Sequence, residues 1–132
     1  MAHRTFHLRN HHEGNAFAIP THVIDSDGAS KDLIGATATY YIKENPSQPD
    51  EEAYVTKEGD EGGIEDEIEF TSPGGGRLTV YVDSEETAGH VDWDSLPEDE
   101  QDEYDLWHRL DITDVDGNRV TVFTGRFVVV NS

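Results

Sequence analysis

Residues 107–130 read WHRLDITDVDGNRVTVFTGRFVVV, two β-branched and apolar runs on either side of an Asp-Gly pair. Such a pair between alternating apolar segments is the strongest short-range signal of a β-hairpin, because Gly117 accepts the positive φ that the turn requires. The sequence therefore predicts a hairpin with strands over 107–113 and 119–130. We expect the last strand to lie inside its sheet, which favours a compact β module that works through its surface.

Shorter segments upstream carry the same strand signals, separated by Gly-, Pro- and Asp-rich turns: residues 5–9, 15–25, 34–43, 53–57, 64–70 and 78–82. Pro20 favours an edge position for its strand. Single helical turns are expected at 84–88, capped by Ser84 or Asp83, and at 97–101, capped by Ser95. The spacing predicts an all-β fold, a single Ig-like antiparallel β-sandwich of about seven strands. We expect one domain over residues 1–132, with an acidic insertion at about 89–103.

Charge is the most unusual property of the composition. There are 29 acidic residues against nine basic ones, giving a formal net charge of −20. The acids are spread through the strand pattern, so they predict a carboxylate-covered fold, not an acidic tail. Self-repulsion of this size opposes compactness, and it is screened at about 1 M salt, where the Debye length is roughly 3 Å. The composition favours a halophilic host, with an ordinary acidic phage or bacterial protein as the alternative.

Composition also narrows the classes of partner. Direct nucleic-acid binding is not expected, because phosphate contacts need clustered Lys and Arg. No apolar stretch approaches the roughly 18 residues of a membrane span, and no basic leader precedes an apolar core, so no membrane association is expected. The sequence contains no cysteine, which excludes disulfides and thiolate metal sites.

Two Asp-rich turns are the candidate calcium sites. Asp25 and Asp27 lie in one, and Asp114 and Asp116 in the other. Neither segment supplies a bidentate Glu in register, so the simpler interpretation is a turn in which Asp bonds its own backbone. Loose cation association with the acidic surface is the other alternative. The histidines near the N-terminus have no recognised ligand spacing (His3, His7, His11 and His12), and we predict no metal and no cofactor.

Catalytic patterns are weak. The run of glycines at 74–76 lacks a following Lys-Ser/Thr and precedes a strand, so it predicts a turn, not a phosphate-binding loop. In so acidic a chain any two carboxylates resemble an acid/base pair, and no nucleophile elbow is present. We predict a protein that is not an enzyme. Trp93, with Leu96 beside it, is the candidate partner contact, either projecting from the acidic insertion or folded over the sandwich.

The order of several segments resembles the N-terminal domain of phage baseplate upper proteins and related short virion proteins. Asp32-Leu33-Ile34-Gly35-Ala36-Thr37 is similar to the "D-L-T-G-A-T" element of that family, with Ile34 in place of the usual Thr. Further similar segments are 6–10, 76–80 followed by 84–88, Tyr104-Asp105-Leu106, 116–118 and 124–129. The insertion at 89–103 and the acidity depart from the family pattern.

The resemblance implies a non-enzymatic docking or adaptor module in the tail or baseplate of a tailed virus, here of a haloarchaeal host. The expected partners are other virion proteins of tail, baseplate or capsid, in several symmetry-related copies. The expected location is the virion, after synthesis in the host cytoplasm. A head decoration or capsid turret component is the alternative. A cell-surface adhesion or carbohydrate-binding domain is a further one.

Overall fold

The structure, a computed structural model, describes residues 4–5, 8–12, 16–25, 27–61, 67–83 and 91–130. The strands are β1 (Arg4–Thr5), β2 (Leu8–His12), β3 (Phe17–His22), β4 (Thr37–Lys43), β5 (Val55–Asp60), β6 (Ile68–Ser72), β7 (Arg77–Val82), β8 (Glu103–Thr113) and β9 (Arg119–Val130). The 3-10 turns are η1 (Asp50–Glu52), η2 (Pro73–Gly75), η4 (Trp93–Ser95) and η5 (Glu98–Glu100).

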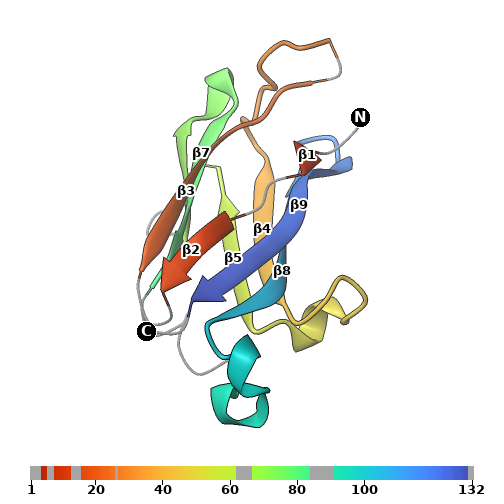
Figure 1. The fold of residues 1–132 in the computed structure, drawn as a ribbon. Coiled ribbons are helices and arrows are strands. Elements are labelled where there is room, and N and C mark those ends of the chain that lie inside the picture. Colours follow the sequence, from red (N-terminus) through yellow and green to blue (C-terminus); the bar gives the residue numbers. More distant parts are fainter. Residues whose placement is uncertain are drawn as a thin grey trace.

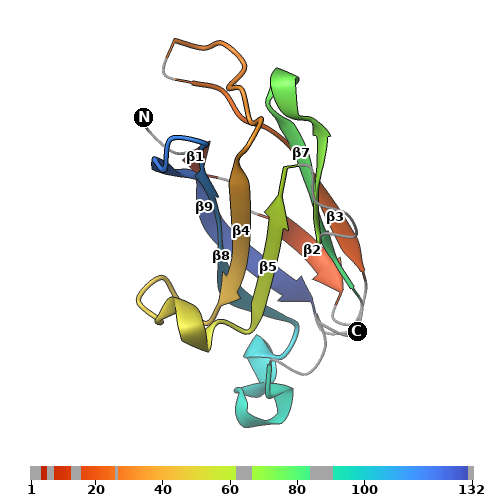
Figure 2. The ribbon, with the colours of Figure 1, turned by 180° about the vertical axis from the view of Figure 1, so that it is seen from behind.

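Two sheets face each other as the layers of a sandwich (Figures 1 and 2). The larger sheet has the order β1-β9-β8-β4-β5, with β2 also paired to β9, and the smaller has the order β3-β7-β6. In Ig domains, strands B, E and D lie in one sheet and strands C, F and G in the other. Here β3, β7 and β6 take the places of B, E and D, and β4, β8 and β9 take those of C, F and G. The predicted all-β, Ig-like sandwich is confirmed.

The N-terminal strands add a parallel pairing to the predicted antiparallel fold. Arg4 of β1 is opposite Phe123 and Leu8 of β2 is opposite Phe127, and both strands run parallel to β9. The register shifts between Leu8 and His11. Parallel neighbours need a long connection, and here the whole sandwich lies between them. This pairing covers the edge of β9, so the last strand is internal, as the hairpin predicted.

The closing hairpin forms at the predicted place. Gly117 has a φ of 89°, and the amide of Asp114 donates to the carbonyl of Asn118 at 2.9 Å. Strand β9 then pairs with β8 along its length, with one shift of register between Leu110 and Asp111. The hairpin thereby lies at the centre of the larger sheet and carries much of its inner face.

Several predicted boundaries differ from the structure. Strand β4 begins at Thr37 and not at Ile34, because Gly35 has a φ of 79°, outside the range of a strand. Strand β5 continues to Asp60 through a segment expected to be a loop. There Gly59 lets the two sheets approach, since a Cβ on it would lie 2.6 Å from the carbonyl oxygen of Ile68.

The other helical and strand expectations have mixed outcomes. The turn expected at 97–101 is present as η5, with Pro97 at its N-cap instead of Ser95. The turn expected at 84–88 and part of the strand expected at 64–70 lie outside the described residues. Pro20 is in β3, which pairs only with β7 among the described strands, so its predicted edge position is confirmed.

The core lies between the sheets and includes a hydrogen-bonded Tyr–His pair. Tyr40 of β4 and His108 of β8 are both fully buried, with Tyr40 Oη 2.9 Å from His108 Nδ1. The rings of Phe123 and Phe127 lie 5.1 and 5.9 Å from that of His108. Because each polar atom of this contact has a partner, the pair is accommodated among apolar side chains. Burial raises the pKa of Tyr40 well above its usual value, which keeps the phenol neutral.

Candidate interaction surface at the loop end

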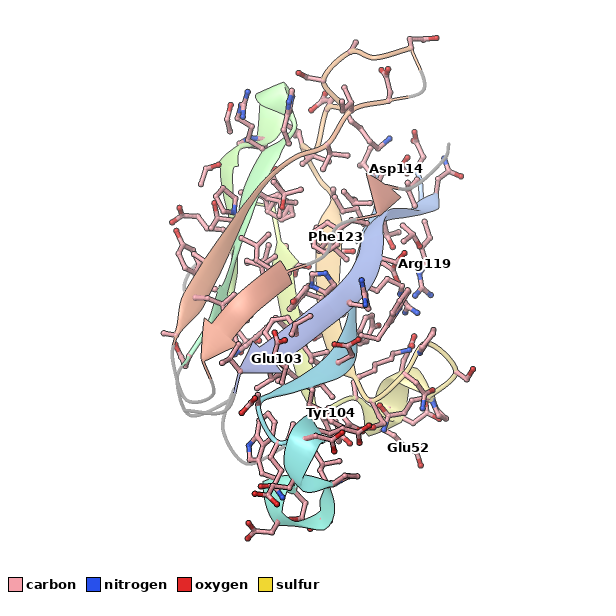
Figure 3. All side chains as sticks on the ribbon, in the orientation of Figure 1. Glu52, Glu103, Tyr104, Asp114, Arg119 and Phe123 are labelled. Carbon is pink, nitrogen blue, oxygen red and sulfur yellow. The ribbon has the colours of Figure 1, made fainter. Side chains whose placement is uncertain are left out.

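One end of the sandwich is formed by the β3–β4 loop (residues 23–36), the β8–β9 turn (114–118) and the end of β5 at residues 60–61; we call it the loop end. The β3–β4 loop projects farthest in Figure 1, and Asp114 lies near this end in Figure 3. In Ig-like folds, loops gathered at one end of a rigid sandwich form the usual recognition surface.

The two candidate calcium turns both lie in the loop end and have the same geometry. Asp25 Oδ1 accepts from the amides of Asp27 and Ala29 at 2.9 and 3.1 Å. Asp114 Oδ1 accepts from the amides of Asp116 and Asn118 at 3.0 and 2.9 Å. Each turn is therefore an Asx-type turn, the simpler interpretation, in which one carboxylate oxygen holds its own backbone.

The backbone hydrogen bonds lower the pKa of Asp114, the bond from Asn118 being the largest cause. Its other oxygen, Oδ2, is 3.5 Å from Lys31 Nζ, so the ion pair joins the turn to the β3–β4 loop across 83 positions of the chain. The side chains of Asp27 and Asp116 are exposed. Of the four candidates, Asp25 and Asp114 thus serve loop structure.

Further contacts bind the β3–β4 loop to the sandwich. The amide of Val23 donates to the carbonyl of Gly76 at 2.7 Å, and that of Leu33 to Pro73 at 2.8 Å. Leu33 is itself fully buried. The amide of Gly35 donates to Glu61 Oε1 at 3.0 Å, which adds the end of β5 to the assembly. The loops of the loop end are therefore held to one another and to the sandwich by hydrogen bonds and an ion pair.

Two large apolar side chains are exposed at the loop end. Ile34 is 57% exposed and Val115 is 71% exposed. A Cβ on Gly35 would lie 2.8 Å from Val115 Cγ2, so Val115 lies directly against Gly35, the residue that follows Ile34 in the sequence. Ile34 and Val115, which we call the exposed pair, are thus exposed apolar residues of the loop end, and Val115 lies beside the backbone neighbour of Ile34. The other exposed large apolar residue among those described is Tyr81, on β7.

Sequence reasoning missed the exposed pair, because Ile34 read as a strand residue and Val115 as part of a hairpin turn. The available signal was the apolar Ile34 directly before Gly35, a residue type that readily adopts turn conformations. Leu33 and Ala36 on either side of this position point into the core, and Ile34 between them is left exposed to solvent.

The predicted contact residues Trp93 and Leu96 lie in the acidic insertion, at the opposite end of the sandwich (Figure 1). Trp93 is half-buried and packs against the core, and Leu96 is half-buried with its carbonyl accepting from Gln101 Nε2 at 2.9 Å. Of the two alternatives for Trp93, the structure favours the one folded over the sandwich. A partner contact by these residues stays a prediction.

Near the insertion, the carboxylate of Glu44 accepts hydrogen bonds from two tyrosine hydroxyls. Tyr54 Oη donates to Glu44 Oε2 at 2.6 Å, and Tyr104 Oη donates to Oε1 of the same carboxylate. The hydrogen bond to Glu44, followed by burial, raises the pKa of Tyr54 to about 12 and also raises that of Tyr104. This bridge fastens the start of β8 to the β4–β5 connection (Tyr104 is labelled in Figure 3).

A folded-state pKa above the unfolded value of about 10 means that the bridge contributes stability below pH 10 and loses it as the pH rises through about 12. We expect Tyr54 to form tyrosinate later than an ordinary phenol in a spectrophotometric titration, with Tyr54→Phe identifying its signal. Glu44→Gln should move the Tyr54 titration back toward about 10, whereas Glu69→Gln, an exposed acid on β6, should not. An unchanged titration in Glu44→Gln would contradict the assignment.

An ion-pair network covers the outer face of the larger sheet. Asp111, 4% exposed, accepts from Arg109 Nε at 2.9 Å, from Arg119 at 2.5 Å and from Thr121 Oγ1 at 2.8 Å. Arg109 also donates to Asp50 at 2.9 Å. The bonds of Asp111 raise the pKa of Arg119. The network holds the start of β9 to β8, and β8 to η1.

Asp50 is the second carboxylate of this network. It pairs with the buried Lys43, whose Nζ also donates to the carbonyl of Gln48 at 3.0 Å. The hydrogen bond from Lys43, partly offset by burial, lowers the pKa of Asp50. Because these charges pair with one another, the arrangement fits a structural role for this face.

Within the described ranges, no three His, Asp or Glu side chains are grouped so that they could hold a metal ion. The side chains of the N-terminal histidines lie outside what the structure describes. Among the same residues, no helix has the length and apolar character needed to cross a membrane. No known protein-family model matches the chain, and no curated protein shows significant similarity to it.

Proposed function

We propose that the chain is a non-enzymatic structural protein of a virion, acting as a docking module in the tail or baseplate of a tailed virus. The observation that carries the proposal is the loop end, where Ile34 and Val115 are 57% and 71% exposed on loops tied to the core. Exposed apolar side chains on a rigid scaffold are typical of protein–protein contact sites.

The positions of the family-like segments support the same role. Residues 32–37 build the loop end: Leu33 and Ala36 are buried anchors, and Ile34 between them is exposed. Residues 124–129 lie in β9, an internal strand of the larger sheet. The segments on which the resemblance rests therefore form both the scaffold and the proposed contact surface.

The proposed partners are other virion proteins, met by several symmetry-related copies of this chain. The location is the particle, with synthesis in the cytoplasm of a halophilic host. A head decoration or turret component would use the same docking surface. Separation of heads from tails distinguishes the two locations.

The test is the composition of purified particles. Particles banded in a density gradient at the salt concentration of the host should contain the chain at a fixed copy number by quantitative mass spectrometry. After mechanical separation of heads from tails, we expect the chain in the tail fraction. Recovery with heads would move it to the decoration role, and absence from intact particles would remove the virion proposal.

A further inference from the structure

The structure also points to the kind of partner. Resting on the proposed function, we infer that the exposed pair inserts into an apolar pocket of a different virion protein, and that Lys and Arg side chains surround that pocket. The partner is thus identified by its chemistry: apolar at the centre and basic at the rim.

The apolar centre follows from the exposed pair. Ile34 and Val115 come from loops far apart in the sequence, and Val115 packs against Gly35, the residue after Ile34, where a Cβ would be 2.8 Å from Val115 Cγ2. Leaving both side chains in water is unfavourable, and burying them against apolar side chains of a partner favours binding. This contribution does not depend on Coulomb attraction, so it persists at molar salt.

The basic rim follows from the charges around the exposed pair. The side chains of Asp27, Asp32 and Asp116 are exposed on the same loops. Lys31, the cation within these loops, is already paired with Asp114. The surroundings of the pair are therefore acidic, and a complementary partner presents cations there.

The same charges argue against a second copy of this chain as the occupant. Two copies meeting through their loop ends would bring these carboxylates together, and like charges in contact are unfavourable. At about 1 M salt the Debye length is roughly 3 Å, so only charges in direct contact count. A basic rim in contact with these acids would then select the partner, while the apolar centre supplies affinity.

The loop end is also preorganised. The Lys31–Asp114 pair, the Gly35–Glu61 hydrogen bond and the buried Leu33 fix the loops before any partner binds. A fixed surface loses little conformational entropy on binding, so a small contact can be effective.

The first experiment replaces the wild-type chain in virus-producing cells by the double variant Ile34→Asp, Val115→Asp. Both side chains are exposed, so the variant should retain the wild-type circular dichroism spectrum at host salt. We expect its copy number per purified particle to fall by about tenfold or more. The matched control is Tyr81→Asp, at the exposed apolar residue of the other sheet, which should change copy number less than about twofold.

The second experiment identifies the pocket. The chain has no cysteine, so Ile34→Cys, Val115→Cys and Tyr81→Cys each introduce a unique thiol. Each variant, labelled with a benzophenone maleimide and assembled into particles, is irradiated and its adducts are sequenced by mass spectrometry. We expect adducts from positions 34 and 115 in a segment of a different virion protein with apolar residues flanked by Lys or Arg.

The outcomes separate the two proposals. Particles that contain the wild-type chain and take up the double variant at the wild-type level would overturn the inference alone. Adducts with an acidic segment, or with another copy of this chain, would overturn it as well. Absence of the wild-type chain from particles would overturn the proposed function and, with it, this inference.

Discussion

Transfer from about 3 M to about 0.05 M salt should unfold this protein, with loss of its β circular dichroism signal. The 29 acidic and nine basic residues give a net charge of −20 on a single small sandwich. Ion pairs compensate the charge locally, as in the Asp50 and Asp111 network. With 29 acids against nine basic residues, such pairs cannot neutralise the acidic surface as a whole. At low salt, repulsion among these carboxylates extends beyond about 10 Å and acts on the compact state more than on the expanded one.

A matched variant tests the cause of this unfolding. Six exposed acids can be changed to their amides: Glu51, Glu52, Glu69, Glu98, Asp99 and Glu100. If charge repulsion drives the transition, this variant should unfold at a lower salt concentration than the wild type. A wild-type fold that is indifferent to salt would count against a halophilic host. An unchanged midpoint in the variant would count against repulsion as the cause.

Phe127→Ala should lower the free energy of unfolding by about 3–5 kcal/mol, measured by denaturant titration at host salt. Phe127 is 1% exposed, and its ring lies 5.2 Å from that of Phe17 in the facing sheet and 5.9 Å from that of His108. Truncation would remove these contacts and leave a cavity between the layers. A domain of this size has about 5–15 kcal/mol of stability, so the loss would be a large part of the total.

The control for this truncation is Tyr81→Ala, which removes an aromatic ring that is 44% exposed on β7. We expect a loss below about 1 kcal/mol, because little apolar area leaves the interior. A similar loss in both variants would mean that the closing strand does not hold the two sheets together.

The strand pattern could be predicted because its causes are local. Pro20 lacks an amide donor, and β3 is accordingly an edge strand of the smaller sheet. Gly59 shows the limit of this reasoning. Its segment reads as an acidic, Gly-rich loop, yet it pairs with β4 as part of β5, and the opposing backbone of Ile68 leaves no room for a Cβ at this position. Such a contact depends on how the sheets meet and has no signal in the neighbouring residues.

The candidate site was less accessible to prediction. Trp93 was predicted to contact a partner because aromatic residues in loops are frequent at protein–protein interfaces, but in the structure it packs against the core. The surface that is exposed combines Ile34 with Val115, two residues that look ordinary in their own segments. Their proximity depends on the Lys31–Asp114 pair and on the close approach of Val115 to Gly35.

By itself, the sequence determined the closing hairpin, its Asp-Gly turn and the two Asx turns, because backbone dihedral angles and side-chain bonds over two to four positions decide them. Only the tertiary structure decided the parallel pairing of β1 and β2 with β9, and the packing of Val115 against Gly35, next to Ile34. These contacts join residues some 80 or more positions apart, and the packing of the two sheets brings them together. For this protein, short-range chemistry specifies the scaffold and long-range packing forms the surface that it presents.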